Sequence, residues 1–129
     1  MNANTMTNKL ATVYDIIQRR DLDFAMISEA GLKTQKSPKI EVYTAFRTNH
    51  AHKNRGSIIY MKEMYTKVTL RIEDPEEKDV DSEIIHLRVD GDPACNIISV
   101  YLKPGMNADE AAKTLAILQR KVDTCAATG

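Results

Sequence analysis

The sequence predicts an α+β domain in which a β-sheet layer is flanked by two helices. Apolar residues recur at helical spacing near both ends of the chain, in Thr7–Arg20 and after Asn107. Between these ends lie several short segments rich in β-branched and aromatic residues, as strands are. Because the helices bracket the strands rather than alternate with them, we expect two layers, with both helices on one face of the sheet.

The composition argues against several classes of protein. The 129 residues are enough for one hydrophobic core, so we expect a single domain over residues 1–129. The 18 basic and 18 acidic residues cancel, so no net field draws the chain to nucleic acid or to a membrane. No apolar run has the length of a bilayer span and the N-terminus lacks the apolar core of a signal peptide, which predicts a cytoplasmic or nuclear location. Cys95 and Cys125 form no CxxC motif, and we expect free thiols.

The first helix, Thr7–Arg20, leads directly into a predicted strand, Asp23–Ser28. The helix carries an apolar stripe formed by Leu10, Val13, Tyr14 and Ile17. The continuous apolar run Phe24–Ile27 predicts a strand buried on both faces, and a carboxylate, Glu29, follows it almost at once. In α/β architectures, ligands bind beyond the carboxyl ends of such strands. Glu29 therefore either begins a solvated turn or belongs to a site.

The next part of the chain predicts a loop over Gly31–Lys39, a strand over Ile40–Phe46 and a second loop over Arg47–Arg55. The second loop is rich in Arg, Lys, Asn and His, which are the side chains that contact phosphates. It is either an ordinary solvated loop or a phosphate-contacting loop formed by Arg47, Asn49, His50 and Arg55. His50 and His52 are two residues apart and would point in opposite directions on a strand, which argues against a metal pair.

Two further strands are expected at Gly56–Met61 and Lys67–Ile72, and the short connection between them predicts that they pair in an antiparallel hairpin. In the second strand, we expect a buried face formed by Val68, Leu70 and Ile72. The following segment, Glu73–Glu83, holds seven carboxylates in eleven residues and is expected to be a solvated loop.

The last strands are expected at Ile84–Val89 and Cys95–Leu102, joined by a turn at Asp90–Pro93. We interpret His86 as a sheet residue with satisfied hydrogen bonds. The final helix begins after Asn107, which has capping-box spacing to Glu110. Its apolar stripe is formed by Ala111, Leu115, Leu118 and Val122.

The succession of NANTMTNK, DLDFAMISEAGL, NRGSIIYM, EIIHLRV and NIISVYLKPG resembles the N-terminal half of the endonuclease/exonuclease/phosphatase superfamily. It is most similar to the endonuclease domains of non-LTR retrotransposons, and the similarity covers nearly the whole chain. The resemblance implies half of a four-layer α/β sandwich. It also implies a metal-dependent phosphodiesterase that acts on DNA.

The resemblance assigns roles to individual residues. Asn2 matches the active-site Asn, Glu29 matches the metal-binding Glu, and Tyr101 matches a Tyr that lies near the phosphate. Arg55 and Gly56 match the start of an R-G-G strand. The implied cofactor is Mg²⁺ or Mn²⁺, because a carboxylate binds a hard cation and the cation stabilises charge on the attacked phosphate.

The sequence also departs from the family. Thr5 and Ser57 replace glycines of its motifs, the first strand is missing, and no Asp-x-Asn or Asp-His motif is present. Without these motifs no general base is available to activate water. We therefore expect the chain to be incomplete or inactive as an isolated endonuclease, and to need a second protein chain or a homo-oligomer that completes the sandwich.

Three functional hypotheses remain open. The chain is a fragment or remnant of a metal-dependent endonuclease, or a non-catalytic interaction or structural module that works within an oligomer or complex. The third is a small DNA-binding or RNA-binding protein that uses Arg47–Arg55, against which the zero net charge counts. Metal binding by Glu29 would favour the first hypothesis.

Overall fold

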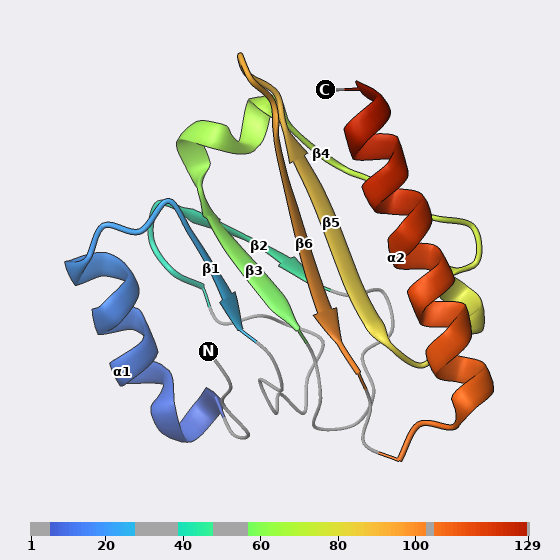
Figure 1. Cartoon of the computed structure of the whole chain (residues 1–129). Helices are drawn as coiled ribbons and strands as arrows, with labels where there is room; N and C mark the ends of the chain where they lie inside the picture. The colour runs from blue at the N-terminus through green and yellow to red at the C-terminus, as the bar shows by residue number, and fades with distance from the viewer. Residues whose placement is uncertain (1–5, 28–38, 48–56, 103–104, 129) are drawn as a thin grey trace. The chain divides into compact units, whose positions relative to one another are not determined.

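The computed structural model describes residues 6–27, 39–47, 57–102 and 105–128, and it confirms an α+β fold with antiparallel sheets (Figure 1). The chain divides into two compact units, Met1–Lys67 and Val68–Gly129. Instead of one sheet that carries both helices, the described residues form two three-stranded sheets, one in each unit. The single domain expected over residues 1–129 stays a prediction.

The first unit contains one helix and three strands in the order β1-β3-β2, with β3 antiparallel to both neighbours. These elements are α1 (Met6–Arg19), β1 (Phe24–Ile27), β2 (Tyr43–Arg47) and β3 (Ile58–Lys62), followed by the 3₁₀ helix η1 (Glu63–Val68). Val13 and Ile17 of α1 are one turn apart and both are buried against the sheet. The core also contains Ile27, Ile40, Tyr43, Ile58 and Tyr60.

A buried tyrosine fastens the C-terminal end of α1 to the sheet. The Tyr43 hydroxyl donates a hydrogen bond of 2.6 Å to the Leu22 carbonyl oxygen and lies 3.4 Å from the Ile17 carbonyl oxygen. Leu22 follows the end of α1 by three residues, so this hydroxyl satisfies a carbonyl oxygen of the chain that leaves the helix, which burial would otherwise penalise. Burial raises the pKa of Tyr43.

The second unit contains three strands in the order β4-β5-β6 and one long helix. Its elements are β4 (Thr69–Arg71), the 3₁₀ helix η2 (Glu77–Asp79), β5 (Glu83–Val89), β6 (Cys95–Tyr101) and α2 (Ala108–Thr128). The β5–β6 hairpin confirms the predicted strands and the turn between them. Helix α2 packs along this sheet, where Ile117 joins a small apolar cluster with Val80 and Ile84 (Figure 1).

The N-terminal cap of α2 is as expected, but only half of the capping box forms. Asn107 Oδ1 accepts a 2.8 Å hydrogen bond from the Glu110 backbone N–H. The Glu110 carboxylate, whose partner in a capping box would be the Asn107 backbone, instead lies 3.4 Å from the backbone nitrogen of Asp81.

The predicted pairing between the third and fourth strands is wrong. β3 pairs with β1 and β2, whereas β4 pairs with β5. The connection that was expected to be a tight turn is the helix η1, and a helical connection does not fold two strands back on each other as a hairpin turn does.

Two predictions of strand burial are also wrong. Strand β1 is not buried on both faces: Phe24 and Met26 are 39% and 38% exposed, because β1 has only one strand neighbour and only its other face meets α1. The expected buried face of the fourth strand is mostly open, with Leu70 60% exposed. Leu70 pairs in register with the half-exposed Arg88.

The buried face of α2 differs from the predicted apolar stripe. Leu115 and Val122 are 63% and 53% exposed, whereas Thr114, Ile117 and Lys121 are buried. The helix turns a different face to the sheet from the one that the apolar stripe predicts, because two of these three side chains have polar partners in the same unit. Thr114 Oγ1 lies 2.7 Å from Ser82 Oγ, and Lys121 pairs with Glu77. Polar groups can be buried when such partners satisfy them.

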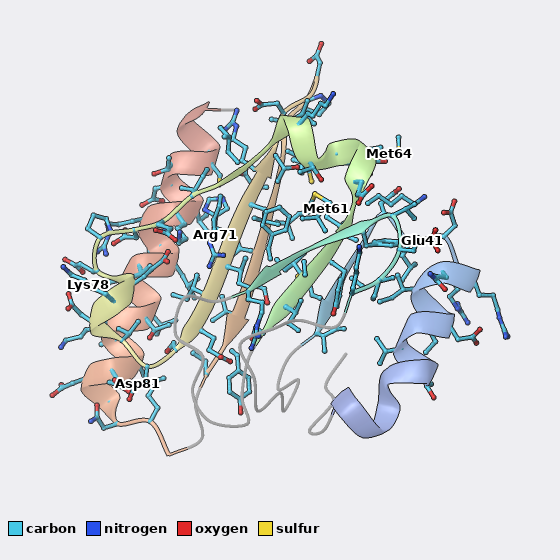
Figure 2. The ribbon with its side chains drawn as sticks, turned by 180° about the vertical axis from the view of Figure 1, so that it is seen from behind. Glu41, Met61, Met64, Arg71, Lys78 and Asp81 are labelled. Carbon is cyan, nitrogen blue, oxygen red and sulfur yellow. The ribbon has the colours of Figure 1, made fainter. Side chains whose placement is uncertain are left out.

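The acidic segment Glu73–Glu83 is not a simple solvated loop. It contains η2, and Figure 2 shows its course along α2, with Lys78 and Asp81 labelled. Arg120 Nε and Nη2 bind the two carboxylate oxygens of Asp74 at 3.0 and 3.1 Å, which lowers the pKa of Asp74. Glu83 at the end of the segment is the first residue of β5 and is only 3% exposed.

Candidate functional site

One end of the first sheet gathers the strand ends that lead to the predicted site residues. Ile27, the last residue of β1, is paired with Ile58, the first residue of β3, and Ile58 is paired with Arg47, the last residue of β2. Residues paired in this way lie on the same face of the sheet, here the face that α1 covers. Neighbouring strands are about 4.8 Å apart, so the two outer strand ends are separated by about 10 Å.

This arrangement follows from the antiparallel order of the strands. β1 and β2 run toward this end and β3 runs away from it, so two exits and one entry of the chain meet there. Glu29 follows β1 by two residues, and Arg55 precedes β3 by three. Arg47 is the one residue of the predicted phosphate-contacting loop that the structure describes, and it is partly buried.

The other predicted residues of this site lie outside the described residues. These are Asn2, Glu29, Asn49, His50 and Arg55. Their proximity, and the roles that the resemblance implies for them, stay predictions.

A second strand end, in the other unit, holds Tyr101. Tyr101 is the last residue of β6 and pairs in register with Glu83, the first residue of β5. The two side chains share the face of the sheet opposite α2, because they alternate with Ile84 and His86, which face that helix. A buried carboxylate beside a phenol is a pair of hydrogen-bonding groups at the end of two strands.

Glu83 was missed by the sequence analysis. It stands last in a run of seven carboxylates, and the run was interpreted as one solvated segment. The only signal in the sequence is that Glu83 directly precedes the apolar strand residues Ile84 and Ile85, so that a strand one residue longer includes it.

The opposite end of the first sheet carries an unexpected polar cluster. Lys62 Nζ contacts Asp21 Oδ1 at 2.6 Å, and the Tyr65 hydroxyl donates a 3.1 Å hydrogen bond to Asp23 Oδ1. The bond to Asp21 raises the pKa of Lys62, and the bond to Asp23 raises the pKa of Tyr65. Each of the two carboxylates thus has a hydrogen-bond donor, and the four side chains form a polar network on the surface at this end of the sheet.

The described part of the chain contains no group of three or more His, Cys, Asp and Glu side chains arranged to hold a metal ion. At the end of the sheet that leads to Glu29, the paired residues Ile27, Ile58 and Arg47 include no carboxylate. Cys95 and Cys125 are free thiols, as expected.

Comparisons of the chain with protein-family models, with curated proteins and with solved structures found no match. The described helices include none that is long and apolar enough to cross a membrane.

Proposed function

We propose that this chain is the N-terminal half of a metal-dependent endonuclease-like phosphodiesterase, built as half of the sandwich of the endonuclease/exonuclease/phosphatase superfamily and acting on DNA. The observation that supports the proposal most strongly is the register of the first sheet. Ile27, Ile58 and Arg47 are paired across its three strands, so the strand ends beside two of the resembling motifs, DLDFAMISEAGL and NRGSIIYM, meet the end of β2 at one end of one sheet.

In this proposal, Glu29 binds Mg²⁺ or Mn²⁺, with Asn2 beside the metal or the scissile phosphate. Arg47, Asn49, His50 and Arg55 contact the phosphates of the substrate. A guanidinium can form two parallel hydrogen bonds to a phosphate, which holds it in one orientation. In this proposal the phosphodiester group lies between Glu29 and Arg47, beyond the ends of the strands.

In this proposal the Tyr101 hydroxyl donates a hydrogen bond to a phosphate oxygen of the substrate, and Glu83 lies beside Tyr101 in the sheet. The two residues are paired in register on one face of the second sheet, so the carboxylate is within reach of the phenol. A phenol has one hydrogen to donate and a phosphodiester oxygen only accepts, so Glu83 cannot hold that hydrogen while Tyr101 contacts the phosphate.

Phosphodiester hydrolysis also needs a base to activate water, and this sequence has no Asp-x-Asn or Asp-His motif to supply it. The proposal therefore requires that groups outside this sequence, such as those of a partner chain, supply the base. Until that partner is present, the chain binds metal and DNA without rapid cleavage.

Metal binding by matched variants tests the proposal. Mn²⁺ binding to the full chain is measured by isothermal titration calorimetry for the unchanged protein, Glu29→Gln and Glu41→Gln. Glu41 is an exposed carboxylate of the same unit and serves as the control. We expect Glu29→Gln to lose binding by at least tenfold and Glu41→Gln to retain it. Equal affinities in the three proteins would contradict the proposal.

A second candidate function, a non-catalytic interaction module, is favoured by the surface of α2. Leu115 and Val122 are seven residues apart, which places them on one face of the helix, and both are more than half exposed. An amphipathic helix that presents apolar side chains outward commonly binds a partner. Here the partner is a second copy of this chain.

Light scattering tests this alternative. A dimer in the unchanged protein that becomes a monomer in Leu115→Glu would support it, with Ala116→Glu, an exposed position about 100° around the helix from Leu115, still dimeric as the control. A monomer at every concentration would contradict it. The mass measured by light scattering does not depend on metal binding, so the two functions are tested independently.

A further inference from the structure

A buried network of polar side chains joins α2 to β5 in the second unit. His86 of β5 is 2% exposed, and the Lys121 side chain of α2 is 4% exposed. Lys121 Nζ forms a 2.7 Å ion pair with Glu77 Oε1 and donates a 3.1 Å hydrogen bond to the Ile72 carbonyl oxygen. The same nitrogen lies 3.5 Å from His86 Nδ1.

The partners of His86 define its protonation. An ammonium group only donates hydrogen bonds, so Nδ1 must be the accepting, unprotonated nitrogen of the imidazole. The proton then resides on Nε2, which donates to Asn96 Oδ1 of β6 at 2.9 Å. Cys125 Sγ of α2 lies 3.8 Å from the same nitrogen. The network thus requires a neutral His86.

The surroundings of His86 shift its pKa in both directions. Burial lowers its pKa most strongly, and the positive charges of Lys121 and Arg88 lower it further. The hydrogen bond from Nε2 to Asn96 and the negative charge of Glu77 raise the pKa, but the net direction is downward. At neutral pH the ring is therefore uncharged, as the hydrogen bonds require.

We propose that His86 and Lys121 form a pH-sensitive latch that holds the C-terminal half of α2 on the sheet. A proton on Nδ1 turns the acceptor into a donor that faces another donor, and it places two positive charges 3.5 Å apart in a buried site. Lys121 can relieve this conflict only by leaving the site, and α2 moves with it.

Only the C-terminal half of α2 separates from the sheet, because the N-terminal half is held by groups that do not titrate. Thr114 Oγ1 lies 2.7 Å from Ser82 Oγ, and Ile117 is packed against Val80 and Ile84. These contacts precede Lys121 in the chain. Residues from Lys121 to the C-terminal end of α2 are therefore released first, as a fraying helix end.

The direction of the pH dependence follows from the lowered pKa. Above the ordinary histidine pKa of about 6.5, His86 is neutral in the folded and unfolded chain, and the latch contributes fully. As the pH falls below this value the unfolded chain takes up a proton that the folded chain resists, so stability falls. The equilibrium constant for folding falls by up to about tenfold for each pH unit, until the pH is below the pKa of His86 in the folded chain.

The test uses the full-length chain, the His86→Gln variant, and His52→Gln as the matched control in the other unit. Urea unfolding is measured from pH 8 to pH 5, together with amide hydrogen-exchange protection factors along α2. We expect the unchanged protein and His52→Gln to lose stability below pH 6.5 and to lose protection from Lys121 onward before Thr114. We expect His86→Gln to remove most of this pH dependence.

A second measurement does not rely on a variant that loses the buried imidazole. The pH titration of the His86 ring is followed by NMR in the unchanged protein and in the charge-neutral double variant Lys121→Met with Glu77→Gln. We expect a midpoint below 6.5 in the unchanged protein and a higher midpoint in the double variant. A midpoint at or above 6.5 in the unchanged protein, or uniform loss of protection along α2, would overturn the latch.

Discussion

The two helices are fastened to their sheets by different chemistry. Helix α1 contributes Val13 and Ile17 to an apolar core, and its end is held by the Tyr43 hydroxyl. Of the buried residues of α2, only Ile117 is apolar, whereas Thr114 and Lys121 are held by polar partners. Apolar contacts are non-directional and indifferent to pH, whereas a polar network fixes the helix in one orientation and depends on protonation. The two units should therefore respond differently to mutation, salt and acid.

The largest loss of stability is expected from a substitution in the apolar core that holds α1 on its sheet. Ile17 is 1% exposed, so Ile17→Ala removes buried methylene groups and leaves a cavity. We expect a loss of about 4 kcal/mol in the free energy of unfolding. Urea unfolding monitored by circular dichroism measures this loss, with the exposed neighbour Gln18→Ala as the control. A loss below about 1 kcal/mol would mean that α1 is not fastened by its apolar core.

Lys121→Met should have the next largest effect. The variant keeps the length of the side chain but removes the cation that pairs with the Glu77 carboxylate and the donor of the Ile72 carbonyl oxygen, while Glu77 keeps its hydrogen bond from the Asp74 backbone N–H. We expect a loss of about 3 kcal/mol, because the Glu77 carboxylate is only 17% exposed and a mostly buried charge without its ion-pair partner is strongly penalised. The measurement is urea unfolding at pH 7.5, and Lys113→Met, on the exposed surface of the same helix, is the control.

The Lys121 prediction has an internal check. Adding Glu77→Gln removes the uncompensated charge, so the double variant should be more stable than Lys121→Met alone. If the double variant were instead less stable by the sum of both single losses, the ion pair would not be what holds α2.

A smaller effect is expected from Tyr43→Phe, which keeps the ring in the core and removes only the hydroxyl. The Leu22 carbonyl oxygen then loses its 2.6 Å hydrogen bond. We expect a loss of about 1 to 2 kcal/mol. In the same unfolding assay, Tyr65→Phe, which breaks an exposed bond to Asp23, should cost less. Equal losses would show that the hydroxyl of Tyr43 does not fasten α1.

The smallest effect is expected from Arg120→Ala at the surface of the second unit. Arg120 binds Asp74 through two hydrogen bonds and Glu76 through a third, but its side chain is 45% exposed. Water and salt screen such pairs, so the loss should be small and should shrink in 0.5 M NaCl. The loss caused by Ile17→Ala should not shrink in salt. Carboxyl NMR should show the pKa of Asp74 rising toward its ordinary value in the variant.

Local signals in the sequence predicted most of the elements. The apolar spacing located α1, and Asn107 marked the start of α2. The Asp90–Pro93 segment identified the β5–β6 hairpin, because turn residues between two strand-like segments determine a local connection. These features depend on residues close to one another in the chain, and the sequence shows such residues directly.

Long-range features were not predictable in this way. Lys121 was not expected to be buried, because the sequence does not show that Glu77 and the Ile72 carbonyl will be within its reach. Leu115 and Val122 were expected to be buried because a hydrophobic stripe was assumed to face the sheet. Likewise, β4 pairs with β5 rather than β3 because of register and connection geometry, which composition does not encode.

The candidate site was predicted from motifs, and the structure bears on only part of it. Arg47 and Tyr101 each lie at the last position of a strand. The sequence placed these residues next to strand ends but could not show which ends meet. The pairing of Ile58 with both Ile27 and Arg47, and of Glu83 with Tyr101, comes from the register of the sheets.

Strand β3 differs from its neighbours because Ile58, Ile59, Tyr60 and Met61 are all at most 1% exposed, so both of its faces are covered. A strand with one wet face can accept polar replacements at every second position, but β3 has no such position. Over evolutionary time, substitutions should therefore accumulate at exposed sites such as Leu70 and Leu115 long before they are tolerated in β3. In related chains, these four residues would be the slowest part of the first unit to change.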